Sequence, residues 1–249
     1  MPPTSTRTIN YAARSVDLHK IYGDPDNSVK AVDGISADFA RGTFTAVMGP
    51  SGSGKSTLMH CLAGLDSVSA GQVFLGDVEI TGMTDNELTK LRRDRVGFVF
   101  QSFNLLPMLT ARQNIVLPLD LGGNRVDEKR FTALVRSLGL TDRLGHRPSE
   151  LSGGQQQRVA VARALITLPE VVFADEPTGS LDSKNGAALL SYLRLCVREG
   201  GQTVVLVTHD PMAAAYADRV LLLADGRLAG ELNDPTPDSV LTAIRTLAA

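Results

Sequence analysis

The sequence predicts an α/β fold whose main sheet is largely parallel, with an antiparallel β layer before it and a block of helices inserted in it. Three observations predict this fold. A mostly apolar strand, a glycine-rich loop and a helix follow one another over residues 43–63. The apolar stretches 171–174 and 203–208 alternate with helical ones, as strands buried on both faces do. Residues 102–168 instead show apolar residues at helical spacing.

The length and composition fit one globular domain with a smaller subdomain. The net charge of −2 gives no basic field for nucleic acid, so we expect no nucleic-acid partner. No apolar run approaches the ~18 residues of a membrane span, and Met1–Thr6 lack the apolar core of a signal peptide. Cys61 and Cys196 fall on separate predicted helices and are expected to be buried free thiols. The expected parts of the chain are a core at about 1–101 and 169–249 and a helical subdomain at about 102–168.

Turn residues and period-two patterns predict the early elements. The antiparallel layer is expected to contain the strands 12–22 and 29–39, on either side of the turn-rich segment 23–27. A hairpin at 71–80 with a Gly76-Asp77 turn completes it. A short helix with a basic end follows at 84–93, and the apolar strand 96–100 ends at Gln101. Pro107 and Pro118 break the pattern of the helical block, whose helices are expected at 111–116, 127–138 and 153–168.

The last part of the chain alternates strand and helix. Asp210-Pro211 begins a helix, with the aspartate as N-cap and the proline at the first helical position. Asp225-Gly226 is a strong hairpin turn between the strands 220–223 and 227–229. The other expected elements are helices at 184–198 and 236–248.

The glycine-rich loop Gly49–Thr57 fits the phosphate-loop pattern of glycine, four residues and Gly-Lys-Ser. Its glycines let backbone N–H groups converge on an anion, at the positive end of the helix that follows. Lys55 supplies a charge for the β- and γ-phosphates, and the Ser56 hydroxyl suits Mg²⁺. The flanking strand and helix favour this interpretation over a plain connecting loop. The sequence thus predicts a P-loop NTPase core, with a nucleotide bound by Gly49, Ser51, Gly52, Ser53, Gly54, Lys55, Ser56 and Thr57.

Asp175 and Glu176 follow the apolar strand 171–174, so they stand where the phosphate loop also opens. Two adjacent carboxylates commonly mean a solvated turn. In a chain with a phosphate loop, we expect Asp175 to hold Mg²⁺ and Glu176 to polarise a water molecule aimed at the γ-phosphate.

Two more polar residues end core strands. His209 follows strand 203–208, and its position favours a contact with the γ-phosphate or with water over a structural role. Gln101 ends strand 96–100 and could be a Mg²⁺ ligand, orient water, or be a surface glutamine.

Leu151–Gln155, Leu-Ser-Gly-Gly-Gln, is a second glycine-rich helix start, and we call it the signature segment. Ser152 caps the helix, and the free N–H groups make another anion site. The residues alone leave two interpretations open: a well-capped helix, or a site for a nucleotide held by another subunit.

These motifs stand in the order seen in ATP-binding cassette (ABC) ATPases, which the chain resembles over residues 20 to about 225. The resemblance implies a head-to-tail homodimer formed on ATP binding, with Mg²⁺ and two ATP molecules at the interface. Ser152, Gly153 and Gly154 would then act on the nucleotide of the other subunit, and Asp182 would cross the interface. Tyr22 matches the aromatic residue that stacks on adenine, although a core tyrosine is the alternative. The turn 23–28 varies in length in such proteins and bears only on how the adenine is placed.

Residues 100–107, 114–119 and 147–150 resemble the MacB/LolD/FtsE-like branch. This implies an integral membrane permease partner of FtsX-like or MacB-like type, docked near 102–120, and a cytoplasmic location at the inner face of the membrane. The function would be export, lipoprotein release or transmembrane mechanotransmission. Alternatives are an ATP-switched regulatory subunit of a cell-envelope or division complex, a soluble ABC ATPase acting on ribosomes or DNA, and a P-loop kinase.

Overall fold

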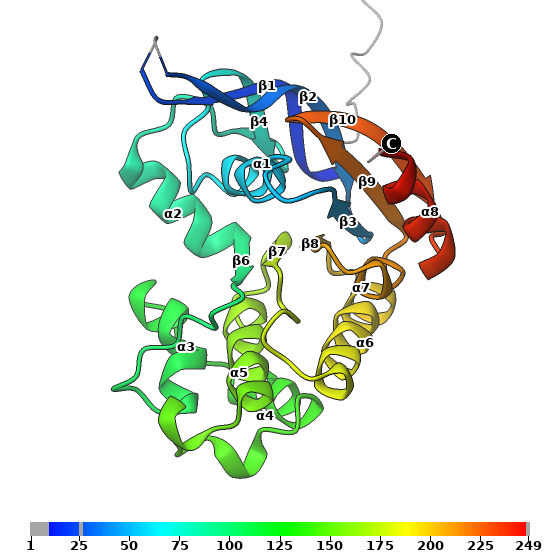
Figure 1. Ribbon diagram of the computed structural model, residues 1–249. Coiled ribbons are helices and arrows are strands. Elements are labelled where there is room, and N and C mark those ends of the chain that lie inside the picture. The colour runs from blue at the N-terminus through cyan, green and yellow to red at the C-terminus, as the bar shows by residue number, and fades with distance from the viewer. Residues whose placement is uncertain (1–9, 25–26, 248–249) are drawn as a thin grey trace, which may run out of the picture.

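The computed structural model describes residues 10–24 and 27–247, and it contains two β-sheets (Figure 1). The order of the four-stranded sheet is β2-β1-β4-β5, and that of the six-stranded sheet is β10-β9-β3-β8-β7-β6. The first is antiparallel throughout, and the second is parallel from β9 to β6. The predicted α/β fold with an antiparallel β layer is confirmed. The predicted Met1–Thr6 segment, Pro25 and Asp26, and residue 248 lie outside the described residues.

The helices and strands have the following bounds. The strands are β1 Tyr11–Tyr22, β2 Val29–Ala40, β3 Phe44–Met48, β4 Ala70–Leu75, β5 Val78–Glu79, β6 Val96–Val99, β7 Val171–Asp175, β8 Val204–Val207, β9 Arg219–Ala224 and β10 Arg227–Asn233. The α-helices are α1 Lys55–Leu62, α2 Asp85–Arg95, α3 Ala111–Leu121, α4 Glu128–Ser137, α5 Gly153–Leu165, α6 Ser183–Gly200, α7 Pro211–Ala214 and α8 Pro237–Leu247. Short 3-10 turns occupy Thr141–Arg143 and Pro148–Glu150.

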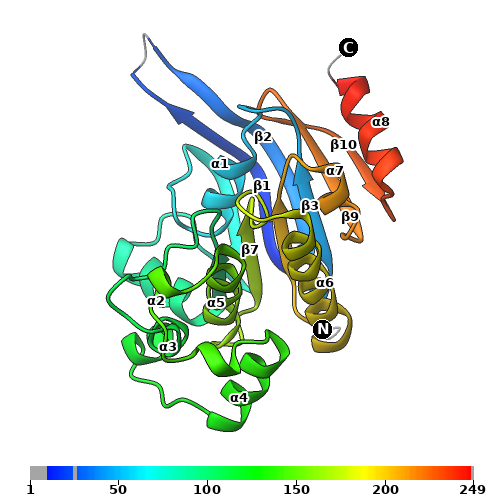
Figure 2. The same ribbon diagram turned by 60° about the horizontal axis from the view of Figure 1, so that its bottom comes forward.

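The six-stranded sheet has a separate apolar core on each face. Alternate residues of β7 show this: Phe173 packs with α1 and the four-stranded sheet, and Val172 packs with α5 and α6. Figure 2 shows α5 and α6 in front of the sheet, with α1 and β1 behind. Because both faces are covered, β3 and β8 are wholly buried and contain apolar residues at nearly every position.

Parallel pairing places the ends of the central strands along one edge. Asp175 at the end of β7 pairs with Val207 at the end of β8, and Val207 pairs with Val47 of β3. The phosphate loop follows β3, so this register brings it beside the residues that follow β7 and β8. Side chains at this edge can therefore meet although they lie far apart in the sequence.

The helical block α3–α5 lies below β6 and β7 in Figure 1. Its first helix corrects the prediction, because α3 continues through Pro118 to Leu121 instead of ending near 116. A proline removes one helical hydrogen bond. Here the turn beyond it is closed by the Gly122 N–H, which donates to the Pro118 and Leu119 carbonyls, and the helix start carries a capping box from Thr110.

Other helix boundaries differ less from the predictions. Helix α1 begins at Lys55, directly after Gly54, which adopts a left-handed φ of 93° and serves as its N-cap. Asp210 caps α7 by accepting from the Met212 N–H at 2.8 Å, as predicted. Both cysteines are free, as predicted, but only Cys61 is buried, whereas Cys196 is partly exposed. None of the helices in the described residues combines the length and apolar character needed to cross a bilayer.

Candidate functional site

The loop between β3 and α1 is pressed against neighbouring backbone. A Cβ atom at Gly54 would lie 2.1 Å from the Ala31 carbonyl oxygen of β2, and one at Gly49 would lie 2.1 Å from the Leu223 carbonyl oxygen of β9. Both residues also have positive φ values, 93° and 155°. Only glycine fits at these two places, and the close contacts hold the loop as a cradle in which backbone N–H groups can converge on an anion.

Lys55 lies inside this cradle. Its side chain is buried, and its ammonium donates to the Pro50 carbonyl at 2.7 Å and more weakly to the Ser53 hydroxyl at 3.4 Å. Burial lowers the pKa of Lys55, although the charges of Glu176 and Asp175 oppose the shift. The protein groups around the cation thus compensate its charge only in part, and a bound anion would complete the charge balance.

Ser56 and Asp175 present oxygen atoms to the same space. The Ser56 hydroxyl donates to Asp175 Oδ1 at 3.1 Å, and His60 Nε2 lies 3.7 Å from Oδ2. Burial raises the pKa of Asp175, and the hydrogen bond from Ser56 and the neighbouring His60 offset part of this rise. A carboxylate and a hydroxyl beside a phosphate cradle are the hard ligands that Mg²⁺ prefers, so these two residues fit the predicted metal.

We predict that Asp175→Asn stabilises the nucleotide-free protein at neutral pH. The raised pKa means that the ionised carboxylate opposes folding, so wild-type stability falls relative to the amide variant as pH rises above about 4. Thermal unfolding of both proteins without Mg²⁺ or nucleotide, as a function of pH, measures this difference. A variant that is less stable at neutral pH would show that the Ser56 and His60 contacts outweigh burial of the charge.

Glu176 and His209 meet at the ends of neighbouring strands. His209 Nδ1 lies 2.8 Å from Glu176 Oε1, and the Glu176 N–H donates to the Val207 carbonyl at 2.9 Å. Glu176 adopts a left-handed φ of 46°, which non-glycine residues rarely do. A residue held in this way is aimed by its surroundings, and here the carboxylate lines the same cavity as Lys55.

Gln101 is exposed one residue beyond the predicted strand. It lies against the segment that follows Glu176, because a Cβ atom at Gly179 would come within 2.8 Å of its Nε2 atom. The Ser180 hydroxyl also donates to the Gln101 carbonyl at 3.2 Å. The structure thus brings Gln101 to the Glu176 loop, and its role toward Mg²⁺ stays a prediction.

The cavity over the phosphate loop, about 530 Å³ in volume, includes residues to which the sequence assigned no role. Residues 29–31 of β2 and the Asp225-Gly226 turn line it together with Ser51, Gly52, residues 54–57 and Glu176. Gly226 joins the two regions, since its N–H donates to the Ser53 carbonyl at 3.2 Å and its carbonyl accepts from the Asp33 N–H at 2.8 Å. The hairpin turn itself was recognisable, but its place beside the loop depends on sheet register.

Tyr22 lies on the surface at the end of β1, with 42% of its area exposed, so it is not a core tyrosine. Its hydroxyl donates to Asp66 Oδ2 at 2.5 Å, and the Lys20 ammonium lies 4.8 Å from its ring centroid. Partial burial and the Asp66 hydrogen bond raise the pKa of Tyr22. The ring is thus fixed in orientation while keeping open surface on which a flat base could stack.

The signature segment and Asp182 form a second cluster. Ser152 and Gln155 complete a capping box at the start of α5, and Asp182 caps α6 by accepting from the Asn185 N–H at 2.9 Å. A Cβ atom at Gly154 would lie 2.9 Å from Asn185, so the two helix starts touch. Ser152 and Asp182 are exposed, and Gly153 is half-buried. They face solvent and do not line the cavity around Lys55.

Comparison with known proteins identifies the family. The ABC transporter family model matches residues 32–179. The chain is 45% identical over 225 residues to a macrolide export ATP-binding/permease protein MacB of Marinobacter nauticus, covering 90% of this chain and 35% of the relative. It is 43% identical over 221 residues to the ABC transporter ATP-binding protein MJ0796 of Methanocaldococcus jannaschii, covering 86% and 94%. The chain thus spans about a third of the length of the MacB relative.

Solved structures agree with this. A dimeric, post-hydrolysis structure of the ATP-binding cassette MJ0796 bound to ADP and Pi has a TM-score of 0.82 at 39% identity, covering 90% of this chain and 99% of that one. CbiO1 of Clostridium perfringens, part of a CbiONQ ABC transporter complex, has a TM-score of 0.80 at 28% identity, covering 96% and 94%. The resemblance to the MacB-like branch is confirmed by these relatives. The chain belongs to the ABC transporter family, and within it to the ATP-binding cassettes that hydrolyse ATP.

Proposed function

We propose that this cassette dimerises around two Mg-ATP molecules and that hydrolysis drives an integral membrane permease of FtsX-like or MacB-like type. The observation that carries the proposal is the single cavity lined by Lys55, Ser56 and Glu176, with Asp175 bonded to Ser56. Export, lipoprotein release and transmembrane mechanotransmission all suit such a partner. The cassette would work at the cytoplasmic face of the membrane.

Each residue at the strand edge has a chemical task in this proposal. The phosphate loop and Lys55 would hold the β- and γ-phosphates, and Ser56, Asp175 and Gln101 would hold the Mg²⁺, which would neutralise phosphate charge when bound. Glu176 accepts a proton from the attacking water, and His209, 2.8 Å from its Oε1 atom, fixes its orientation beside the γ-phosphate.

The signature cluster completes the site in the dimer. Gly153 and Gly154 offer N–H groups at the start of α5, whereas Ser152 offers its hydroxyl, because its own N–H donates to Gln155 Oε1 at 2.9 Å. Asp182 stands next to them at the start of α6. Because Ser152 is exposed, it is available to the γ-phosphate held by a second copy, and the exposed Asp182 would cross the interface beside that site. ATP then favours the closed dimer through contacts that hydrolysis removes.

We predict that Tyr22→Ala weakens ATP binding by about tenfold and that Tyr22→Phe keeps it nearly intact. Loss of a base-stacking aromatic ring costs about 1–3 kcal/mol, whereas the ring itself remains in phenylalanine. Titration with a fluorescent ATP analogue measures both affinities. Equal losses in the two variants would show that the hydroxyl bonded to Asp66, and not the ring, carries the contribution.

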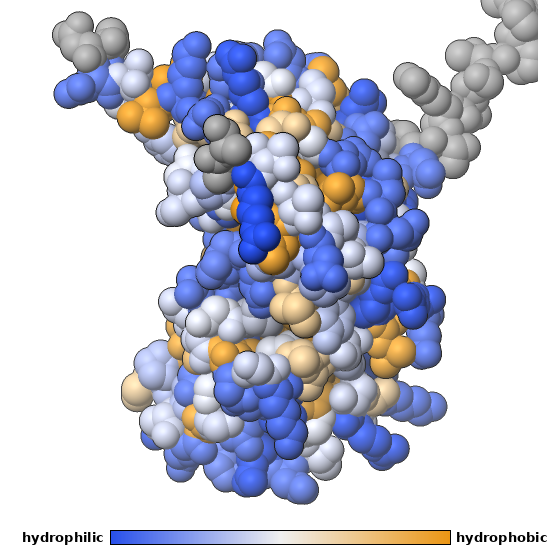
Figure 3. Space-filling view, turned by 45° about the vertical axis from the view of Figure 1, so that its right-hand side comes forward, coloured by the Kyte–Doolittle hydropathy of each residue, from blue (hydrophilic) through white to orange (hydrophobic). Residues whose placement is uncertain are grey.

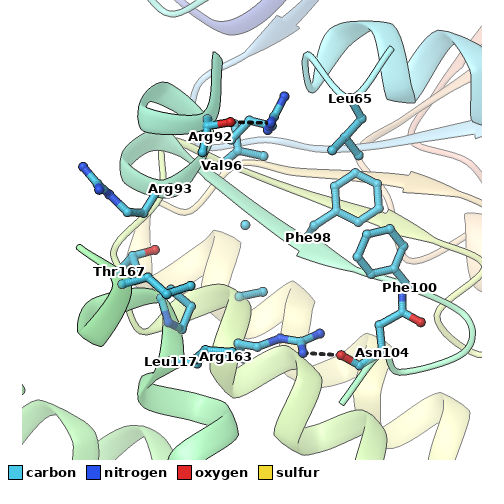
Figure 4. Close-up of a pocket in the computed structure, with 15 residues that line it drawn as sticks. Leu65, Arg92, Arg93, Val96, Phe98, Phe100, Asn104, Leu117, Arg163 and Thr167 are labelled. Atoms are coloured by element: carbon cyan, nitrogen blue, oxygen red, sulfur yellow. Dashed lines mark hydrogen bonds between the residues drawn. The ribbon is translucent and has the colours of Figure 1, made fainter. Parts of the chain in front are cut away.

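The permease would dock in a groove between the sheet and the helical block (Figure 4). This groove has a volume of about 570 Å³ and a mainly apolar floor that includes Phe98, Phe100 and Leu117. Arg93 and Arg163 stand at its sides. Arg163 donates to the Phe103 and Asn104 carbonyls, which are neutral acceptors, so a carboxylate in the groove would gain an ion pair. The groove therefore suits an apolar helix that carries an acidic residue.

The face shown in Figure 3 fits such a partner less well, because its apolar side chains form small separate patches among polar ones. The groove instead combines an apolar floor with cationic walls, and its lining includes Phe100, which directly precedes Gln101. A segment seated there could sense the nucleotide state through the residues that follow β6.

Site-directed cross-linking in membranes tests the proposal. A photoreactive residue at Leu121, which lines the groove and is exposed, should capture an acidic cytoplasmic segment of a permease. Arg93→Glu should abolish the cross-link, and reversing the captured carboxylate to lysine should restore it. Arg198→Glu, on the exposed end of α6, is the matched control and should leave it unchanged. A cross-link whose yield stays the same after both charge reversals would refute docking in this groove.

A further inference from the structure

Gln157 is a polar side chain buried in the second turn of α5, with none of its area exposed. Burying an amide is unfavourable unless its hydrogen bonds are made. The residue lies two positions beyond the signature segment along the helix, but neither the motifs nor the cavity over the phosphate loop includes it. The hydrogen-bond partners of this amide should therefore explain why a polar side chain is buried here.

The amide connects α5 to both candidate catalytic segments. Gln157 Nε2 donates to the Pro177 carbonyl at 2.7 Å and lies 3.5 Å from the Phe100 carbonyl. Pro177 directly follows Glu176, and Phe100 directly precedes Gln101. The NH₂ group must face these two carbonyls, because the opposite orientation of the amide would set oxygen against oxygen. One side chain thus joins the helix of the signature segment to the ends of β6 and β7.

The second amide atom is not satisfied. Gln157 Oε1 is buried and accepts no hydrogen bond from the residues that the structure describes. An unpaired buried acceptor makes the present arrangement unfavourable at this point. A small shift of α5 against β7 that supplied a hydrogen-bond donor to Oε1 would therefore be favoured. Because Nε2 is bonded to the Pro177 carbonyl, such a shift of α5 would also move the segment that follows Glu176.

We propose that Gln157 is a positioning residue for hydrolysis, which sets Glu176 and Gln101 according to the position of the signature helix. The proposal rests on the proposed function of the site. In it, closure of the signature segment on a second copy's nucleotide moves α5, and the Pro177 and Phe100 carbonyls follow through Gln157. Its loss leaves nucleotide binding intact and slows the chemical step.

The test is the steady-state hydrolysis of Mg-ATP by the full chain. Gln157→Met keeps the length and volume of the side chain but removes the donor, and it should lower kcat by about 10- to 100-fold, because catalytic groups tolerate little misplacement. The KM for ATP should stay within about twofold. An unchanged kcat in a folded Gln157→Met protein would overturn the proposal.

Gln202 provides the matched control. Its Nε2 atom also donates to two carbonyls, those of Pro169 at 3.0 Å and Thr203 at 3.2 Å, near the opposite ends of β7 and β8. Gln202→Met loses equivalent hydrogen bonds far from the cavity, so it should change the melting temperature and leave kcat unchanged. An equal loss of kcat in both variants would show a general effect of stability and overturn the positioning role.

Gln157→Glu gives an independent test if the methionine variant does not fold. A buried carboxyl group is protonated at higher pH than usual, and only its protonated form can donate to the Pro177 carbonyl. The ratio of its kcat to the wild-type kcat at the same pH should therefore fall as the pH is raised. A ratio independent of pH would count against the proposal. If the wild-type chain itself hydrolyses no ATP, the proposed function fails, which is a separate outcome.

Discussion

Glu176→Gln is expected to lower the turnover number for ATP by about 10²- to 10⁴-fold while leaving ATP affinity within a few-fold of wild type. A general base contributes a factor of this size, and glutamine cannot accept the proton from the attacking water. The substitution keeps the size of the side chain and still offers an oxygen to His209, whose Nδ1 atom lies 2.8 Å from Glu176 Oε1 in the wild-type protein. Cavity and fold should therefore be preserved.

Two measurements separate this result from simple damage. Phosphate release gives the turnover number, and size-exclusion chromatography with light scattering should show that Mg-ATP now holds the variant as a stable dimer. Dimer accumulation follows because hydrolysis no longer removes the contacts across the γ-phosphate. Glu199→Gln, an exposed glutamate at the end of α6, is the matched control and should match wild type. Steady-state turnover unchanged in Glu176→Gln would refute its assignment as the base.

The parallel core could be predicted because local signals and tertiary context agree there. Wholly apolar stretches such as 171–174 need cover on both faces, and they are followed by polar residues that the parallel register then gathers at one edge. That is why Asp175, Glu176 and His209 could be named from the sequence. The contact between Glu176 and His209 follows from two strands of known direction lying side by side.

Other features depend on contacts that no local pattern encodes. The approach of Gly226 to Ser53 arises from the order of β9 and β3, and the buried bond from Gln157 to Pro177 arises from how α5 packs under β7. The continuation of α3 past Pro118 is a similar case, because packing and the closing bonds of Gly122 outweigh the local preference of proline. Division into a core and a helical subdomain at the stated boundaries stays a prediction.

Lys55→Ala is expected to weaken Mg-ATP binding by at least about 30-fold, since truncating one partner of a buried charged pair costs about 2–5 kcal/mol. The ammonium at present donates to the neutral Pro50 carbonyl at 2.7 Å and the Ser53 hydroxyl. Because both of these partners are neutral, the ammonium is held in place in the loop and can still turn toward a phosphate without breaking an ion pair. Isothermal titration calorimetry with Mg-ATP measures the loss, and Lys129→Ala on the exposed surface of α4 is the control.

The fold should survive this substitution. Because burial lowers the pKa of Lys55, its protonated form opposes folding, and this cost is relieved only as pH rises through the lowered folded pKa. At neutral pH the nucleotide-free alanine variant should thus melt no more than slightly below wild type, and its relative stability should decline as pH becomes alkaline. Wild-type affinity for Mg-ATP in a folded Lys55→Ala protein would show that the phosphate loop does not bind the nucleotide. The cavity lined by Glu176 and Gly226 would then need another ligand.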